Sequence, residues 1–238
     1  MIRHLILTIT LGTTCTATGF AALLDADFND KTVNAPIGQG GAAVGEPTFV
    51  NGGMTAIVRD APMASNCLEL SDISSGAGFA RFDFVDLMEV STGHVTISAD
   101  LWFAEFDEFT FGIRESETFF SNFAQLTFTS SGDIEYADGN SATRLIGTYG
   151  TGYAVPVRLE FDMDARRLDV WIEEEPLVEN EAFGIADRGV GAIVIGIGQD
   201  PEALGTFYVD NILAVDPSQL FADGFESGTT DRWSQAAP

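Results

Sequence analysis

The feature that most constrains this chain is an alternation of apolar and polar residues with a period of two. "VRLEFDM" at 157–163 puts Val157 and Leu159 on one face and charged residues on the other. "RLDVWIE" at 167–173 repeats the pattern, and the short "DAR" between the two segments leaves room only for a tight reversal. Because successive side chains of a strand point to opposite faces, the two segments predict a β-hairpin over 157–173.

Similar alternating runs recur along the chain, and breaks rich in glycine, asparagine and serine separate them at intervals of about 8–12 residues. That spacing is typical of β-sandwiches and barrels. The best helical candidate, "SETFFSNF" at 116–123, is long enough for only about two turns. The sequence therefore predicts an all-β fold of antiparallel strands. The further runs lie at 55–60, 67–72, 78–84, 94–103, 108–113, 124–129 and 133–138.

The first 21 residues have the order of a secretory signal peptide. A short basic start, "MIRH", precedes a moderately apolar stretch, and Gly19 and Ala21 put small residues at the −3 and −1 positions of a cleavage site. We expect cleavage after Ala21 and export of the remaining chain to the medium or the periplasm. The alternative, a buried N-terminal strand, fits this order less well.

Length and composition favour one domain. Residues 22–217 suffice for a single β-sandwich, and we expect one domain there, followed by a tail at 218–238. The alternative is two smaller β-domains divided in the glycine-rich stretch 139–152. The longest apolar run, "VGAIVIGIG" at 190–198, has the length of a strand and falls far short of the roughly 18 residues of a membrane span. We expect a monomer that does not span a membrane.

The charge of the chain excludes whole classes of partner. Once Arg3 leaves with the leader, 36 acidic residues stand against 10 basic ones, which is a net charge of −26. Such a field repels nucleic acid and anionic membranes, so neither is expected as a partner. The acidic residues fit solubility in a salty environment, calcium binding or a solvated face. Cys67 is the lone cysteine after cleavage, so no intrachain disulfide is expected, and its alternating run predicts a buried side chain.

A strand late in the chain contains an unexpected carboxylate. "GTFYVDNILAVD" at 205–216 is mostly apolar, yet Asp210 and Asn211 interrupt it. Aspartate is disfavoured in strands, and a buried carboxylate is costly unless it is paired or bound to a metal. One interpretation is that Asp210 faces solvent while Asn211 caps a bulge.

The hairpin and the segments after it resemble the concanavalin A-like lectin/glucanase superfamily, including its laminin-G-like members. The resemblance is carried by "VPVRLEFDMDARRLDVWIEEEP", "GVGAIVIGIG" and "GTFYVDNILAVD", and "LLDADFND" at 23–30 resembles the first strand of related carbohydrate-binding domains. It implies an antiparallel jelly-roll β-sandwich over 22–217. The chain departs from the pattern at Asn29, where glutamate is frequent after Phe28, and at Glu173–Glu175, where an Asp-Gly turn is usual.

The resemblance also implies a role for Asp210. In these sandwiches the first and last strands lie together at one edge, where acidic side chains and carbonyl groups often hold a structural calcium. Calcium takes six to eight oxygen ligands, which aspartate and asparagine supply without histidine or cysteine. The matching candidates here are Asp27, Asn29 and Asp30 near the first strand and Asp210 on the last.

The tail "LFADGFESGTTDRWS" resembles an ending of many exported bacterial proteins. It also resembles the opening strand of a second sandwich module. A sorting signal, an extra edge strand and a remnant of a second module all remain open. The motif supports export and decides nothing about a ligand.

A glucanase-like activity has only part of its usual set of residues. Glucanases of the superfamily carry three carboxylates on one strand, and "EFDEFT" at 105–110 supplies Glu105 and Asp107 at the expected spacing. The third is missing, because Glu108 points to the opposite face of a regular strand. A retaining mechanism needs two carboxyl groups about 5–5.5 Å apart. With His94 the only histidine after cleavage, histidine-based zinc sites and Ser-His-Asp triads lack their parts.

Aromatic rings beside carboxylates are the usual elements of a sugar site. Trp171 has the opposite parity to its apolar neighbours, which predicts that it shares an outer face with Asp169 and Glu173. An aromatic ring in a sandwich is more often part of the core, and Trp171 is the best exception because its neighbours on that face are charged. Three further rings are candidates: Trp102, Tyr149 and Tyr153.

These patterns predict a secreted, non-catalytic module that binds neutral carbohydrate weakly, with an extracellular polysaccharide or glycan as partner and calcium as its one expected cofactor. One alternative is a structural surface or matrix protein without a small ligand. The other is a glucanase-like glycoside hydrolase that uses Glu105 and Asp107.

Overall fold

The fold is known for most of the chain after the predicted leader. The leader at 1–21 and the tail at 218–238 lie outside the described residues, so both stay predictions. Apart from one 3-10 turn at Val85–Leu87, the regular structure in the described residues consists of β-strands. The computed structural model describes residues 22–38, 45–51, 53–72, 78–116, 122–139, 143–183, 188–198 and 205–217.

Two antiparallel sheets pack face to face and confirm the predicted all-β sandwich. The strand order of the first, sheet A, is β13-β12-β11-β6-β15-β4-β3, and β1 pairs with β15 beside this path. The strands of sheet A are β1 (Leu24–Ala26), β3 (Met54–Arg59), β4 (Cys67–Asp72), β6 (His94–Phe103), β11 (Ala154–Asp162), β12 (Arg167–Ile172), β13 (Glu175–Ala182) and β15 (Thr206–Val215).

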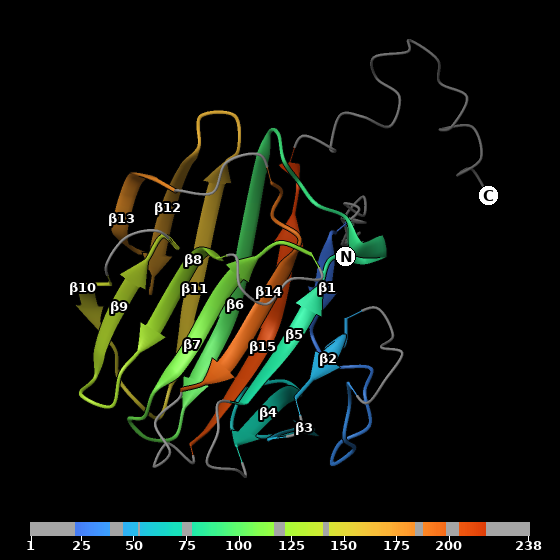
Figure 1. The fold of residues 1–238 in the computed structure, drawn as a ribbon. Coiled ribbons are helices and arrows are strands. Elements are labelled where there is room, and N and C mark those ends of the chain that lie inside the picture. Colours follow the sequence, from blue (N-terminus) through green and yellow to red (C-terminus); the bar gives the residue numbers. More distant parts are fainter. Residues whose placement is uncertain are drawn as a thin grey trace, which may run out of the picture.

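The second sheet, sheet B, has the order β10-β9-β8-β7-β14-β5-β2. Figure 1 shows sheet B in front of sheet A, with the strands of both running in a similar direction. The strands of sheet B are β2 (Phe49–Val50), β5 (Gly78–Asp83), β7 (Phe109–Arg114), β8 (Asn122–Phe128), β9 (Asp133–Ala137), β10 (Arg144–Thr148) and β14 (Ala192–Ile197).

Strands β11 and β12 confirm the predicted hairpin. Their register pairs Val157 with Ile172 and Asp162 with Arg167, and residues 163–166 form the reversal. The two termini of the domain also meet as the resemblance implies. Leu24 of β1 lies opposite Ala214 of β15, so the first and last strands are neighbours.

The core lies between the sheets and is rich in phenylalanine. Ring centroids in one cluster lie 4.8 to 6.3 Å apart, and burying such a side chain stabilises the fold by about 1.5–3 kcal/mol. Cys67 is fully buried, as predicted, and burial raises the pKa of its thiol to about 11. The rings of this cluster are those of Phe103, Phe109, Phe128 and Phe207.

The structure bears on two further interpretations of the sequence. The stretch 139–152 does not divide two domains, because β9 and β10 on either side of its start pair as neighbours in sheet B. The helical candidate 116–123 is mostly outside the described residues, but Asn122 and Phe123 open strand β8. Across the residues that the structure describes, no helix has the length and apolar character needed to cross a membrane.

Candidate functional site

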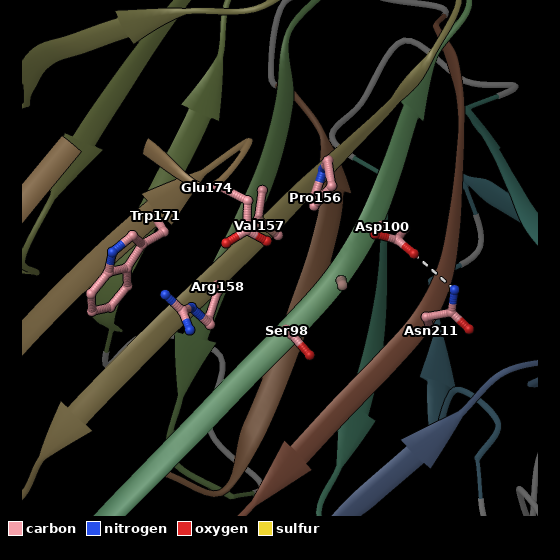
Figure 2. Close-up of a pocket in the computed structure, with 9 residues that line it drawn as sticks. Ser98, Asp100, Pro156, Val157, Arg158, Trp171, Glu174 and Asn211 are labelled. Carbon is pink, nitrogen blue, oxygen red and sulfur yellow. Dashed lines mark hydrogen bonds between the residues drawn. The ribbon is translucent and has the colours of Figure 1, made fainter. Parts of the chain in front are cut away.

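A groove runs over the outer face of sheet A, the face turned away from sheet B. It consists of two adjoining hollows that share Asp100 and Asn211. The Trp171 hollow, shown in Figure 2, is lined by Ser98, Ala99, Asp100, Pro156, Val157, Arg158, Trp171, Glu174 and Asn211. The Tyr153 hollow is lined by Pro62, Met63, Ala64, Ser65, Asp100, Trp102, Gly152, Tyr153, Ala154 and Asn211.

The alternation of three neighbouring strands builds the floor of this groove. Each strand sends its apolar side chains into the core, so its polar and aromatic side chains point outward. Arg158 of β11 lies opposite Ser98 of β6 on one side and Trp171 of β12 on the other. The parity argument that put Trp171 on the outer face therefore matches its place in the sheet.

The Trp171 ring is in contact with the guanidinium group of Arg158. The Arg158 Cζ atom lies 4.3 Å from the centroid of the indole, and its Nη1 atom is 3.3 Å from Oε1 of Glu160. The ion pair is about 40% exposed on both sides, so its contribution to stability is well under about 1 kcal/mol. One face of the indole is thus covered by the guanidinium, and the ring also lines the hollow.

A bulge in β15 shapes the middle of the groove. The register between β15 and β6 shifts between Asp210 and Leu213, and Asn211 has a left-handed φ of 52°. As a result the Asn211 side chain turns toward β6, where its Nδ2 atom donates to Asp100 Oδ2 at 2.8 Å. The predicted bulge at Asn211 is present, but Asp210 beside it does not face solvent.

Asp210, next to Asn211, is fully buried. Its carboxylate accepts a hydrogen bond from the Ser65 hydroxyl and another from the Asn211 backbone N–H at 2.8 Å. Burial raises the pKa of Asp210; the two hydrogen bonds oppose that rise, and the like charges of Asp100 and Asp27 add to it. Asp210 therefore ties the loop before β4 to the bulge of β15 without a basic side chain among these contacts.

The Tyr153 hollow has an aromatic wall. Trp102 packs edge-on against Tyr208, with ring centroids 5.3 Å apart at 79°. Tyr153 is 46% exposed, and its hydroxyl is hydrogen-bonded to the Glu173 carboxylate. That hydrogen bond is the main reason why the pKa of Tyr153 is raised, because it holds the proton on the phenol.

Three of the predicted binding residues line neither hollow: Tyr149, Asp169 and Glu173. Glu173 is connected to the groove through its hydrogen bond to Tyr153. Tyr149 lies in the core, where it packs against Phe103, and its hydroxyl donates to the backbone carbonyl of Thr129 at 2.9 Å. Burial raises its pKa to about 12. Tyr149 is therefore not available as a platform, and its assignment to the sugar site is wrong. Asp169 is on the outer face, but its carboxylate accepts the Asn180 backbone N–H and does not line either hollow.

The two carboxylates considered for catalysis are not on a strand. Glu105 and Asp107 lie in the loop between β6 and β7, where Asp107 Oδ1 accepts the backbone N–H of Glu108 at 2.8 Å. Phe106 between them is 49% exposed instead of buried. The argument that alternation puts both carboxylates on one face therefore does not hold.

The predicted calcium ligands near the first strand already have other contacts. Asp27 Oδ1 accepts the backbone N–H of Asn29 at 3.2 Å, and Asn29 Oδ1 accepts that of Asn66 at 3.3 Å. Asp30 is 74% exposed and lies 3.3 Å from Nζ of Lys31. Lys31 thus partly neutralises the charge that a cation at Asp30 would need.

Carboxylates, histidines and cysteines alone do not form a metal site in the described residues, so a calcium ion here would also need amide or carbonyl oxygens. Within the described residues, no three or more histidine, cysteine, aspartate or glutamate side chains gather in a way that could hold an ion. The charge of Asp27 does act on Asp210, so these two of the predicted ligands are near each other. Calcium binding stays a prediction that rests on this pair.

Several residues of the groove were not assigned to a ligand site from the sequence. Arg158 and Asp100 have the outward parity of Trp171 and Trp102, so the same pattern could have found them. Asn211 could have been found from the change of parity in β15, where Val209 and Ile212 are both buried although three positions apart. Glu174 sits in a turn, about which alternation says nothing.

Comparison with known proteins shows the fold and no family. No protein-family model matches the sequence, and no curated protein matches it. A sialidase of known structure is similar with a TM-score of 0.61 and 13% identity, over 84% of this chain and 19% of the sialidase. The binding domain of botulinum neurotoxin serotype G is similar with a TM-score of 0.52 and 9% identity, over 82% of this chain and 47% of that domain.

At these identities the likeness shows the fold alone. This chain spans about a fifth of the sialidase and less than half of the toxin domain. The antiparallel β-sandwich is therefore the part of the predicted resemblance that is confirmed. Membership of the concanavalin A-like superfamily stays a prediction.

Proposed function

We propose that the chain is an exported, non-catalytic module that binds neutral carbohydrate weakly in the groove on sheet A. The observation that carries this proposal is the combination of aromatic side chains with carboxylate and amide groups in one open groove. Trp102, Tyr153 and Trp171 border it, and Asp100 and Asn211 lie at its middle. That combination suits sugars, which present apolar C–H faces and a rim of hydroxyl groups.

The charges of the groove favour a neutral ligand. Arg158 is the one basic residue that lines either hollow, and it is already stacked on Trp171 and paired with Glu160. Asp100 and Glu174 contribute negative charge, in keeping with the acidity of the whole chain. An anionic polysaccharide would meet repulsion here, whereas sugar hydroxyls donate hydrogen bonds to carboxylates.

The names of the similar structures give modest support. One is a sialidase and the other is the binding domain of a neurotoxin. Both names fit a fold that is used in glycan-related and recognition proteins, but the chain covers too little of either for an activity to be carried over.

A glycan array combined with a hydrolysis assay tests the proposal. We expect binding to neutral oligosaccharides without release of sugar, with dissociation constants by calorimetry of about micromolar to millimolar. Binding to no glycan favours the structural surface or matrix protein. Release of reducing sugar that is lost in Glu105→Gln favours the glycoside hydrolase.

Export and calcium are further parts of the proposal. Mass spectrometry of secreted material should give a chain that begins at or next to Ala22, and an intact Met1 outside the cytoplasm contradicts export. Calcium near Asp27 and Asp210 is supported by the pairing of β1 with β15, since Asp27 directly follows β1 and its charge acts on Asp210 of β15.

A further inference from the structure

The turn between β12 and β13 has an unfavourable sequence for its shape. Ile172 pairs with Glu175, so Glu173 and Glu174 alone form the loop, and their φ angles are 52° and 66°. Two-residue hairpin loops with positive φ at both positions strongly prefer Asn-Gly or Asp-Gly. Glutamate is strained there because its Cβ atom crowds the backbone in the left-handed region.

Three of the residues with left-handed φ lie at or beside the groove. Glu174 and Asn211 line it, and Glu173 is bonded to Tyr153, which also lines it. All three of Glu173, Glu174 and Asn211 have left-handed φ angles, and none is glycine. Strained residues persist where the surrounding structure holds them, and they gather at binding and active sites.

It is the carboxylate of each glutamate, and not its backbone, that glycine or asparagine would not supply in the same way at the groove. The Glu173 backbone N–H donates to the Pro156 carbonyl at 2.9 Å, which fixes the turn over β11, and its carboxylate accepts the Tyr153 hydroxyl. Glu174 lines the Trp171 hollow, and Figure 2 shows its carboxylate in the region between Trp171 and Pro156. The turn thus contributes to both hollows.

We infer that the Glu173–Glu174 turn is the specificity element of the groove and that its ligand is a neutral oligosaccharide of at least two rings. The inference rests on the proposed function. Glu174 accepts hydrogen bonds from the hydroxyls of the ring in the Trp171 hollow. Glu173 holds Tyr153 as the stacking surface for a second ring in the adjoining hollow. Because each hollow holds one ring, a monosaccharide gains only part of this binding.

The test compares a relaxed turn with the native one. The variant E173N/E174G carries the residues that the turn geometry prefers, so its melting temperature should rise by about 3 °C. Its affinity should fall at least about tenfold, measured by calorimetry with hexasaccharides of glucose, mannose, xylose and galactose. The matching monosaccharides should bind the native protein at least about tenfold more weakly than the hexasaccharides.

A second strained pair supplies the matched control. Asp86 and Leu87 have φ angles of 55° and 56° and do not line the groove. D86N/L87G should also raise the melting temperature by about 3 °C, with affinity unchanged. E174Q keeps the strained backbone and removes one charge, so its melting temperature should stay within about 1 °C and its affinity should still fall several-fold.

The outcomes separate the two claims. If the native protein binds none of the hexasaccharides, the proposed function fails and this inference falls with it. If the native protein binds and E173N/E174G or E174Q binds equally well, the turn has no role in specificity and only the inference is overturned. A fall in the melting temperature of E173N/E174G also overturns it, because the turn is then not strained. Equal affinity for monosaccharides and hexasaccharides refutes the two-ring ligand.

Discussion

The outer faces of the two sheets are built by the same alternation of residues, but their side chains pack differently. On sheet B, the outward positions next to Arg81 across the strands hold small residues such as Gly112, Val194 and Gly196. The Arg81 side chain is almost fully buried on this face. On sheet A, large rings alternate with small residues across neighbouring strands and leave an open groove. Alternation therefore decides which side chains point outward, while the sizes of their neighbours decide how far each of them is buried.

The two faces also differ in the partners that they give to a carboxylate with little exposure to solvent. Asp83 on sheet B accepts hydrogen bonds from Arg81 Nη2 at 2.7 Å and from the Thr48 hydroxyl at 2.6 Å. Asp210 on sheet A accepts from Ser65 and from a backbone N–H, and the charges acting on it most are the like charges of Asp100 and Asp27. We therefore expect the first carboxylate to be structural and the second to respond to ions and pH.

The largest effect should come from breaking the pair on sheet B. Asp83→Ala removes the carboxylate that accepts two hydrogen bonds from the buried Arg81, which should lower the free energy of unfolding by about 3–5 kcal/mol in urea titrations. Asp164→Ala, in the exposed turn between β11 and β12, is the control and should change it by less than about 0.5 kcal/mol. Similar losses in both variants contradict a structural role for the pair.

Calcium provides the next largest effect, on sheet A. An ion that binds only the folded state at 100 times its dissociation constant stabilises the protein by about 2.7 kcal/mol. Melting in calcium against chelator should show this gain in the native protein and in Asp164→Ala, and not in Asp210→Ala. Equal melting temperatures with and without calcium remove the predicted site and leave Asp210 without a cation.

The third effect concerns binding instead of stability. Trp171→Ala removes the ring and its contact with Arg158, a contact worth about 0.5–1 kcal/mol at an exposed site. Stability should therefore change by at most about 1 kcal/mol, while glycan affinity falls more than about tenfold. Loss of several kcal/mol in the free energy of unfolding instead assigns Trp171 to the core and ends its role as a platform.

These expectations show where the sequence was informative. The hairpin of β11 and β12 could be predicted because its alternation continues unbroken through both strands, and the same parity put Trp171 outside. The pattern misled at Glu105 and Asp107, because Phe106 continues the alternation in a loop that is not a strand. Periodicity describes which side a residue faces only where backbone pairing is actually present.

The rest of the groove depends on backbone irregularities. Asn211 reaches Asp100 only because a bulge reverses the parity of β15, and Glu174 reaches the groove only through a turn with left-handed residues. Tyr149 was predicted to be at the sugar site. It is followed by glycines, as in an exposed loop, but its ring packs into the core. Such features depend on contacts between segments far apart in the chain, which one sequence does not reveal.

The smallest effect is the pH dependence that Asp210 imposes. Its pKa is raised above the ordinary value of 3.8, so the folded protein holds this proton more tightly than the unfolded chain does. In chelator, ionised Asp210 therefore costs stability near pH 7, and this cost disappears as the pH falls through the raised pKa toward 3.8. Asp210→Asn removes the titration and keeps an acceptor for Ser65.

The free energy of unfolding of the native protein should thus rise relative to Asp210→Asn as the pH is lowered from 7 to 4, measured by urea titration at each pH. With saturating calcium the sign should reverse, because protons then compete with the ion for the carboxylate and acidification weakens the native protein. A difference between the two proteins that stays constant with pH in chelator contradicts the raised pKa. If the free energy of unfolding of the native protein, relative to Asp210→Asn, falls with rising pH in calcium as it does in chelator, Asp210 titrates without binding the ion.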